Sequence, residues 1–224
     1  MNCAIAIDGP AGAGKSTIAR ILAKELSFIY VDTGALYRAI GYRMLTVGID
    51  PADSAAVEEA LPTLTVSIAY VGDEQHVFVN GEDVSGFIRT PEVSMAASRV
   101  SAIPAVRAFL LQTQREMAAT ASVIMDGRDI GTTILPDAQI KIFLTASPEA
   151  RAVRRFKELE EKGVATTYED VLADMVKRDY DDAHRAASPL RRAADAILVD
   201  TSNDTLDEVI ARMKKIVAER LPRA

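Results

Sequence analysis

An apolar run that ends in a glycine-rich turn constrains the fold of this 224-residue chain more than any other feature. Residues 3–8 are mostly apolar, and Gly9, Gly14, Lys15 and Ser16 follow with the spacing G-x-x-x-x-G-K-[ST]. Glycines let backbone N–H groups approach phosphate oxygens because no Cβ atom intervenes. Apolar residues then continue at helical spacing. The pattern therefore predicts a strand, a phosphate-binding loop and a helix whose N-terminus faces the anion.

This loop would hold the phosphates of a nucleoside triphosphate. Lys15 would reach the β- and γ-phosphates, and Ser16 would ligate a Mg²⁺ ion that arrives with the nucleotide. The predicted nucleotide-binding residues are Gly9, Pro10, Ala11, Gly12, Ala13, Gly14, Lys15, Ser16 and Thr17.

Short apolar runs alternate with helical patterns along the chain. Four runs end in aspartate and a fifth ends in Thr145; they span residues 4–8, 28–32, 122–126, 141–144 and 196–200. Strands buried on both faces and separated by helices predict an α/β fold with a parallel five-stranded sheet. Ligands bind beyond the carboxyl ends of such strands.

The aspartates at the ends of the predicted strands can be interpreted in two ways, as Mg²⁺ ligands or as helix caps. Asp126 would hold Mg²⁺ through water, as a Walker-B carboxylate does, and Asp32 could act similarly. An aspartate at the end of a strand is also a common helix cap, and the two roles stay open.

Two stretches interrupt the alternation. Residues 65–83 alternate with period two around Gly72-Asp73-Glu74-Gln75, which predicts a small β hairpin inserted outside the main sheet. Residues 148–189 are charged and helical in pattern, with a turn at residues 163–167.

The charged stretch carries two helical faces rich in arginine. Arg151, Arg154 and Arg155 share one face, whereas Arg178, Asp182 and Arg185 share another. Because like charges at this spacing repel one another, each face favours a bound anion.

Composition excludes several classes of protein. The formal charge of −6 argues against a protein that coats nucleic acid, and no apolar run is long enough to span a membrane. Cys3 is the single cysteine, which excludes an intrachain disulfide and fits a reducing compartment. We expect a cytoplasmic protein with no nucleic-acid or membrane partner.

Several motifs together resemble bacterial cytidylate kinase, a P-loop nucleoside monophosphate kinase, nearly end to end. Besides the glycine loop, they are Asp32-Thr33-Gly34-Ala35 with Tyr37-Arg38, Gly81-Glu82-Asp83-Val84-Ser85 with Ile88-Arg89-Thr90, Asp126-Gly127-Arg128-Asp129-Ile130-Gly131-Thr132, and Arg178-Asp179 with Asp182 and Arg185.

The resemblance implies a phosphoryl transfer from ATP, with Mg²⁺, to CMP or dCMP, catalysed by a monomer. It implies that Asp129, Arg107 and Ser98 read cytosine. The implied phosphate and sugar ligands are Arg38, Arg128 and Arg185 for the phosphate, and Arg178 and Asp182 for the sugar. Thr33 stands where the family often has serine, which leaves the preference between ribose and deoxyribose open.

The charged stretch would then close over ATP as a lid, with Arg154, flanked by Arg151 and Arg155, near the nucleotide. The implied catalytic residues are Lys15, Arg128, Arg154 and Arg185. We predict one domain, residues 1–224, divided into a core (about 1–34, 104–147 and 190–224), an acceptor-binding insertion (about 35–103) and the lid (about 148–189).

Three alternatives remain from the residues themselves. A different small-molecule kinase, acting for example on shikimate or UMP, would share the glycine loop and the lid. A P-loop GTPase would need an Asn-Lys-x-Asp guanine reader, and the chain contains none. A nucleotide-binding protein without turnover is less consistent with the intact Lys15 and Ser16.

Overall fold

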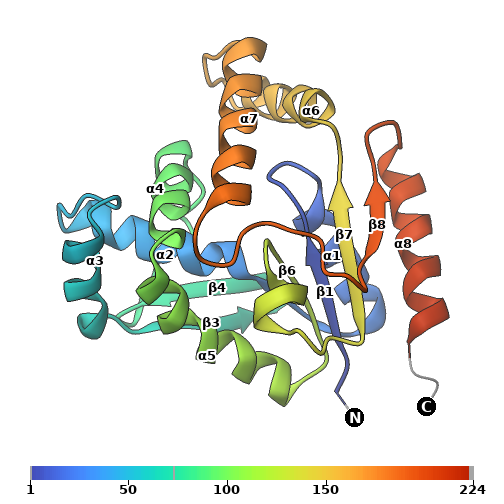
Figure 1. Cartoon of the computed structure of the whole chain (residues 1–224), viewed down its shortest axis with the longest axis horizontal. Coiled ribbons are helices and arrows are strands. Elements are labelled where there is room, and N and C mark those ends of the chain that lie inside the picture. The colour runs from blue at the N-terminus through green and yellow to red at the C-terminus, as the bar shows by residue number, and fades with distance from the viewer. Residues whose placement is uncertain (1, 73, 222–224) are drawn as a thin grey trace.

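In the computed structural model, which describes residues 2–72 and 74–221, a five-stranded parallel sheet forms the centre of the molecule (Figure 1). Its strand order is β2-β6-β1-β7-β8. The strands are β1 (Ala4–Asp8), β2 (Ile29–Asp32), β6 (Val123–Gly127), β7 (Ile140–Thr145) and β8 (Ile197–Asp200). Each begins and ends within one residue of the predicted position, so the predicted sheet is confirmed.

Helices cover both faces of this sheet, as expected for buried parallel strands. On one face α1 and α8 pack against the apolar side chains of β1 and β7, and on the other α5 and the π-helical turn η2 cover β1 and β6. The helices are α1 (Lys15–Leu26), α2 (Thr33–Thr46), α3 (Ser54–Ala60), η1 (Leu61–Thr63), α4 (Pro91–Ser101), α5 (Pro104–Thr120), η2 (Ile130–Ile134), α6 (Pro148–Glu161), α7 (Tyr168–His184) and α8 (Leu206–Arg220).

The predicted β hairpin lies outside the main sheet, in a second lobe. β3 (Val66–Val71) and β4 (Glu74–Val79) are antiparallel, and the short β5 (Glu82–Asp83) adds a third strand that the sequence did not predict. Asp73 of the predicted turn lies outside the described residues, as do Met1 and residues 222–224 of the predicted domain. The hairpin packs with α2, α4 and α5 around a core separate from that of α1 and α8.

Close packing of α2 on α4 fixes this second lobe. A Cβ atom at Gly41 of α2 would lie 2.9 Å from the backbone nitrogen of Ala97 in α4, which leaves no room for a side chain. The close approach sets where α4 presents Ser98.

The two helices of the charged stretch, α6 and α7, stand above the sheet and share a small core of their own (Figure 1). Their connection falls at the predicted turn, residues 163–167. From α7 the chain crosses the front of the sheet and enters β8.

Among the described residues, no single helix has the length and apolar character needed to cross a membrane. α4 and α5 satisfy the length and composition criteria only when joined, and they are bent by 98° relative to each other.

Candidate active site

Three strand ends meet at the same level of the sheet. Asp32 of β2 lies opposite Asp126 of β6, and Asp8 of β1 lies opposite Gly127. Parallel strands that end together create a crevice at their carboxyl ends. A cleft of about 230 Å³ opens there, between the sheet, α4 and α7.

The cleft brings together most of the predicted site residues. Its lining includes Ala11, Gly12, Lys15, Ser16, Thr33, Arg38, Ser98, Arg107, Asp126, Arg128, Asp129, Arg178, Asp182 and Arg185. The predicted residues outside its lining are Gly9, Pro10, Ala13, Gly14, Thr17 and Arg154.

The glycine loop leaves β1 so close to β7 that a Cβ atom at Gly9 would collide with the carbonyl oxygen of Leu144. The loop ends at Gly14, whose φ of 88° is left-handed, and α1 begins at Lys15 as predicted. The Lys15 ammonium is buried and donates a hydrogen bond to the Pro10 carbonyl oxygen at 2.7 Å. Burial, reinforced by the nearby Arg128, lowers the pKa of Lys15 to about 7, so a bound anion would stabilise its charged form.

Asp126 lies beside the start of α1. Its carboxylate accepts hydrogen bonds from the hydroxyls of Ser16 at 2.9 Å and Tyr30 at 3.0 Å. Burial, together with the neighbouring Asp32 carboxylate, raises the pKa of Asp126 to about 6. The hydroxyl of Thr33 donates to the backbone carbonyl of Asp126 at 2.7 Å, so this hydroxyl is already bonded within the protein.

Asp32 has the capping role, one of the two that the sequence left open. One carboxylate oxygen accepts a hydrogen bond from the backbone N–H of Ala35 at 3.0 Å and caps α2. The other oxygen pairs with Arg38 at 2.7 Å.

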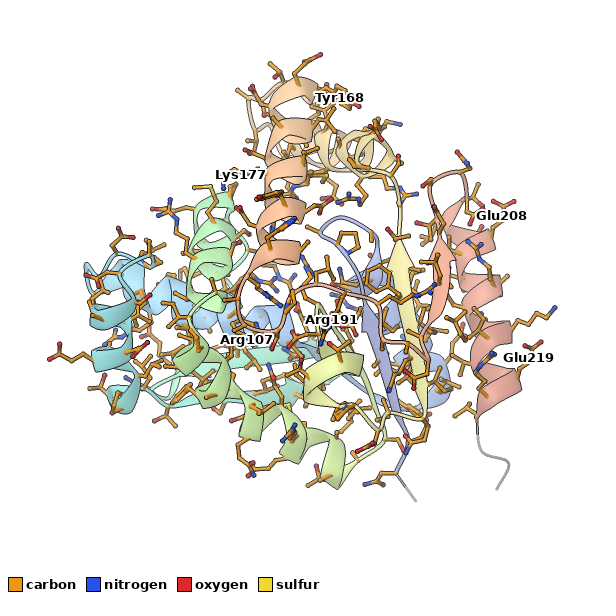
Figure 2. The ribbon with its side chains drawn as sticks, in the orientation of Figure 1. Arg107, Tyr168, Lys177, Arg191, Glu208 and Glu219 are labelled. Carbon is orange, nitrogen blue, oxygen red and sulfur yellow. The ribbon has the colours of Figure 1, made fainter. Side chains whose placement is uncertain are left out.

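The opposite wall of the cleft is built around Asp129, which is 3% exposed. Its carboxylate forms a short ion pair with Arg107 and a second with Arg185 at 3.5 Å. Arg107 also lies over the ring of Tyr37, 5.4 Å from the ring centroid, and Figure 2 shows it near the middle of the molecule. Because Asp129 is bonded on both oxygens, its position in the cleft is well determined.

Asp182 organises the α7 side of the cleft. It accepts from Arg128 at 2.8 Å and lies 3.8 Å from Arg185. Burial acts to raise the pKa of Asp182, but Arg128, Arg178 and Arg185 outweigh it and the pKa is lowered. Burial and the nearby Arg128 lower the pKa of Arg178 to about 10, which is the effect of crowding cations without enough counter-charge.

The cleft as a whole is positively charged. Six cationic side chains and four carboxylates line it, so two positive charges remain unbalanced in a chain whose net charge is −6. Within the described residues, the Nε atoms of Arg38, Arg107 and Arg178 are buried without a hydrogen-bond partner. Buried unpaired donors are rare in proteins and indicate a missing ligand or water. The cleft is therefore suited to small anions.

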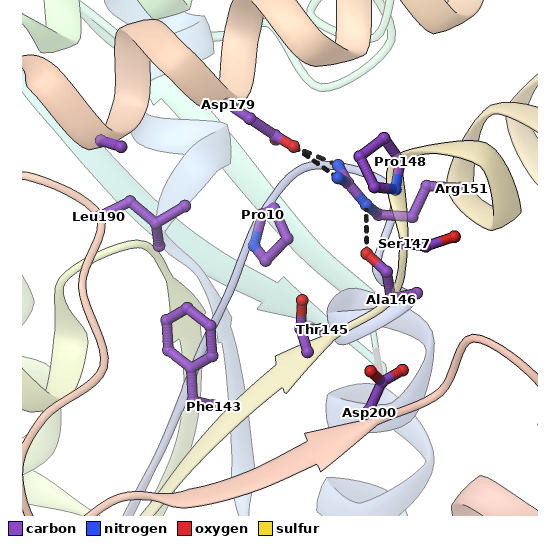
Figure 3. Close-up of a pocket in the computed structure, with 11 residues that line it drawn as sticks. Pro10, Phe143, Thr145, Ala146, Ser147, Pro148, Arg151, Asp179, Leu190 and Asp200 are labelled. Carbon is purple, nitrogen blue, oxygen red and sulfur yellow. Dashed lines mark hydrogen bonds and ion pairs between the residues drawn. The ribbon is translucent and has the colours of Figure 1, made fainter.

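The arginines of α6 do not share a vacant anion site, contrary to the expectation from their spacing. Arg151 is 2% exposed and donates to the carbonyl oxygen of Ala146 at 2.9 Å and to Asp179 (Figure 3). It also donates to the carbonyl oxygen of Ala11 at 2.9 Å. Arg154 donates to Thr201 and Arg155 to Glu158. Each arginine has its own acceptor within the protein: Glu158 lies one turn along α6 from Arg155, whereas Arg151 and Arg154 bond segments outside α6 that helical spacing could not identify.

Arg151 and Asp179 lie at the edge of a second cavity of about 450 Å³ behind the glycine loop, lined by apolar residues such as Pro10, Phe143 and Leu190 (Figure 3). Since Arg151 bonds both the loop at Ala11 and α7 at Asp179, it ties the phosphate-binding loop to the helix that carries Arg178 and Asp182.

Asp8 is a supporting residue whose role the sequence did not reveal. Its two oxygens accept from the backbone N–H groups of Ile130 at 2.7 Å and Gly131 at 2.8 Å. The segment that contains Arg128 and Asp129 is thereby fastened to the strand that leads into the glycine loop.

The titration of Asp8 should be visible in protein stability. Burial raises the pKa of Asp8 from 3.8 to about 6 in the folded protein. The folded state therefore binds the proton more tightly than the unfolded state does, and this contribution to stability is lost as pH rises through the folded pKa. From about pH 4 to about pH 7, wild-type stability relative to Asp8→Asn should fall by on the order of 3 kcal/mol. Urea unfolding of the wild type and of Asp8→Asn across this pH range measures the difference in their free energies of unfolding. If that difference does not change with pH, the raised pKa of Asp8 is wrong.

The parallel sheet and the glycine loop that opens into a cationic cleft define the class of this protein as a P-loop kinase fold. A sequence model of the cytidylate kinase family matches residues 5–219. The chain is 49% identical over 216 residues to a cytidylate kinase of Lactobacillus gasseri, covering 96% of this chain and 94% of that protein. It is 50% identical over 212 residues to a cytidylate kinase of Caldicellulosiruptor bescii, covering 95% and 94%.

This chain belongs to the cytidylate kinase family. Among solved structures, an uncharacterized protein from Eubacterium ventriosum superposes with a TM-score of 0.51 at 15% identity, covering 98% of this chain and 100% of that one. At this identity the likeness concerns the fold alone.

Proposed function

We propose that this protein transfers the γ-phosphoryl group of ATP to CMP or dCMP, giving ADP and CDP or dCDP. The observation that carries the proposal is a single cleft in which the glycine loop, with Lys15 and Ser16, faces a cationic wall built around the buried Asp129. Membership of the cytidylate kinase family supports the same assignment.

The phosphate of the acceptor would be held by Arg38, Arg128 and Arg185. Guanidinium groups suit this task because they bind phosphate oxygens bidentately and stay charged. The unpaired Nε of Arg38 and the lowered pKa of Arg178 support an anion at this place. A bound phosphate would supply the negative charge that the cleft lacks.

The cytosine ring would be read by Asp129, Arg107 and Ser98. Cytosine presents an amino donor beside the N3 and O2 acceptors, so a carboxylate for the amine and donors for the ring match it. Uracil has an acceptor oxygen where cytosine has the amino donor, so this oxygen would face the Asp129 carboxylate without a hydrogen bond between them. Arg178 and Asp182 would contact the sugar hydroxyls.

Mg²⁺ would arrive with ATP and take its ligands from the nucleotide, from water and from the protein. Among residues 2–72 and 74–221, no three His, Cys, Asp or Glu side chains gather in a way that could hold a metal. The Ser16 hydroxyl and the Asp126 carboxylate supply the hard oxygens that Mg²⁺ takes alongside phosphates and water, and they already lie within 2.9 Å of each other. When bound, the ion would neutralise charge on the transferring phosphoryl group.

The chemistry needs no general base, since the attacking phosphate oxygen is already ionised near neutral pH. Lys15, Arg128 and Arg185 would stabilise the charge of the in-line transfer. We propose that α6 and α7 act as a lid that excludes water, with Arg154 released from Thr201 to meet the nucleotide.

A coupled assay of ADP formation tests the proposal with CMP, dCMP, UMP, AMP and shikimate as acceptors. We expect rapid turnover with CMP and dCMP only. Because the Thr33 hydroxyl is bonded to Asp126, we expect the wild-type ratio of kcat/KM for CMP and dCMP to survive Thr33→Ser. Comparable turnover with UMP, AMP or shikimate would reject the assignment of substrate.

A further inference from the structure

The strand β2 lies at the edge of the main sheet, and its outer side would leave backbone N–H and C=O groups unpaired. Buried backbone groups need partners. Here the partners are side chains of the inserted hairpin rather than another strand of the sheet.

These side chains come from one cross-strand pair. Tyr70 of β3 lies opposite Gln75 of β4 in the hairpin register, two residues beyond the pair formed by Ile68 and Val77. Because side chains alternate between the two faces of a strand, Tyr70 and Gln75 continue the face that carries the apolar pair. Two polar side chains thus end an otherwise apolar face, at the place where the hairpin reaches β2.

Gln75 pairs with the backbone of Asp32 much as a strand would. Its side-chain oxygen accepts from the Asp32 N–H at 2.8 Å, and its side-chain nitrogen donates to the Asp32 carbonyl at 3.3 Å. Tyr70 donates its hydroxyl to the carbonyl of Tyr30 at 2.9 Å. Of these two contacts, only the one from Gln75 fixes a residue that faces the cleft.

Asp32 in turn holds Arg38. Its carboxylate caps α2 through Ala35 and pairs with the Arg38 guanidinium at 2.7 Å. Asp32 and Arg38 line the cleft, whereas neither Gln75 nor Tyr70 does. Rotating the Asp32 peptide would redirect its carboxylate and move the guanidinium with it.

We propose that Gln75 is a positioning residue for the acceptor phosphate, acting through the Asp32 peptide and carboxylate on Arg38. The inference rests on the proposed function, in which Arg38 binds that phosphate. It gives the inserted hairpin a task in substrate binding, because its side chains set the geometry of a site that they do not touch.

Steady-state kinetics of Gln75→Leu tests the inference, with Tyr70→Phe as the matched control. Leucine keeps the size of the side chain and removes both hydrogen bonds to Asp32, each of which contributes modestly. We expect KM for CMP to rise about fivefold to tenfold, with KM for ATP unchanged. Tyr70→Phe removes the other contact of the hairpin with β2 and should leave both KM values unchanged.

A double-mutant cycle separates positioning from general loosening. In an Arg38→Met background, Gln75→Leu should no longer raise KM for CMP, because the residue on which it acts is gone. Equal increases in both backgrounds, or a KM for CMP unchanged by Gln75→Leu, would overturn the inference. If Gln75→Leu fails to fold, Gln75→Glu provides a second variant. It keeps the acceptor for the Asp32 N–H but sets a carboxylate oxygen against the Asp32 carbonyl, so KM for CMP should also rise; no rise would overturn the inference.

Hydrogen exchange at the Asp32 amide measures the hydrogen bond between Asp32 and Gln75 independently of enzyme activity. Exchange should accelerate in Gln75→Leu and not in Tyr70→Phe, and equal rates in the wild type and Gln75→Leu would overturn the inference. A wild-type protein inactive toward CMP would instead refute the proposed function, so the two failures are distinguishable.

Discussion

Replacing Lys15 by methionine is expected to lower kcat by about two to three orders of magnitude, the usual effect of removing one preorganised charge donor from a transition state. Lys15 is 6% exposed at the start of α1, where the protein pays the cost of burying an ammonium group. That cost appears as the pKa of about 7, caused by burial and then by Arg128. Because burying the Lys15 ammonium is unfavourable, we expect Lys15 to stabilise the negative charge that develops in the transition state of phosphoryl transfer.

The coupled assay at saturating ATP and CMP measures this effect. Lys215→Met, on the exposed side of α8, is the matched control and should keep wild-type kcat. Methionine retains most of the length of the side chain, so we expect Lys15→Met to fold, as circular dichroism can verify. A folded Lys15→Met protein with kcat within tenfold of wild type would remove Lys15 from the chemistry.

Replacing Asp129 by asparagine is expected to lower kcat/KM for CMP and to reduce the preference for CMP over UMP by roughly tenfold or more. In the wild type the uracil oxygen would face a carboxylate without a hydrogen bond, and an unpaired buried polar group costs about 1–3 kcal/mol. An asparagine side chain can present its amide nitrogen to uracil, which the carboxylate cannot. The substitution also leaves Arg107 and Arg185 with a neutral partner.

The ratio of kcat/KM for CMP to that for UMP is the decisive quantity, because general damage to the cleft would lower both values together. KM for ATP should stay near wild type. Asp137→Asn, an exposed carboxylate, provides the control. A ratio unchanged by Asp129→Asn would show that the base is read elsewhere.

The main elements of the fold were predictable because their signals are local. The five strands are short apolar runs of adjacent residues, and α1 begins where the glycine loop and the helical spacing predict it. Period-two alternation likewise predicted the hairpin, whereas β5 is only two residues long and gives no such pattern.

The candidate site was predictable only in part. The spacing of Gly9, Gly14, Lys15 and Ser16 identified the donor loop directly. The acceptor residues were identified through the resemblance to a family, and their roles stay predictions. Helical spacing could not predict the partners of Arg151 and Arg154 in α6, because their acceptors belong to other parts of the chain. Those acceptors are Ala11, Asp179 and Thr201.

The sequence by itself determined a phosphate-binding loop on a parallel sheet, because backbone freedom at glycine and the periodicity of apolar residues act over a few neighbouring positions. Only the tertiary structure decided which charges meet. Arg107 pairs with Asp129, Arg128 with Asp182, and Gln75 with the peptide of Asp32, across separations of 22, 54 and 43 residues. These pairs form because the strand ends, the hairpin and α7 pack around one cleft. No local sequence pattern predicts that packing.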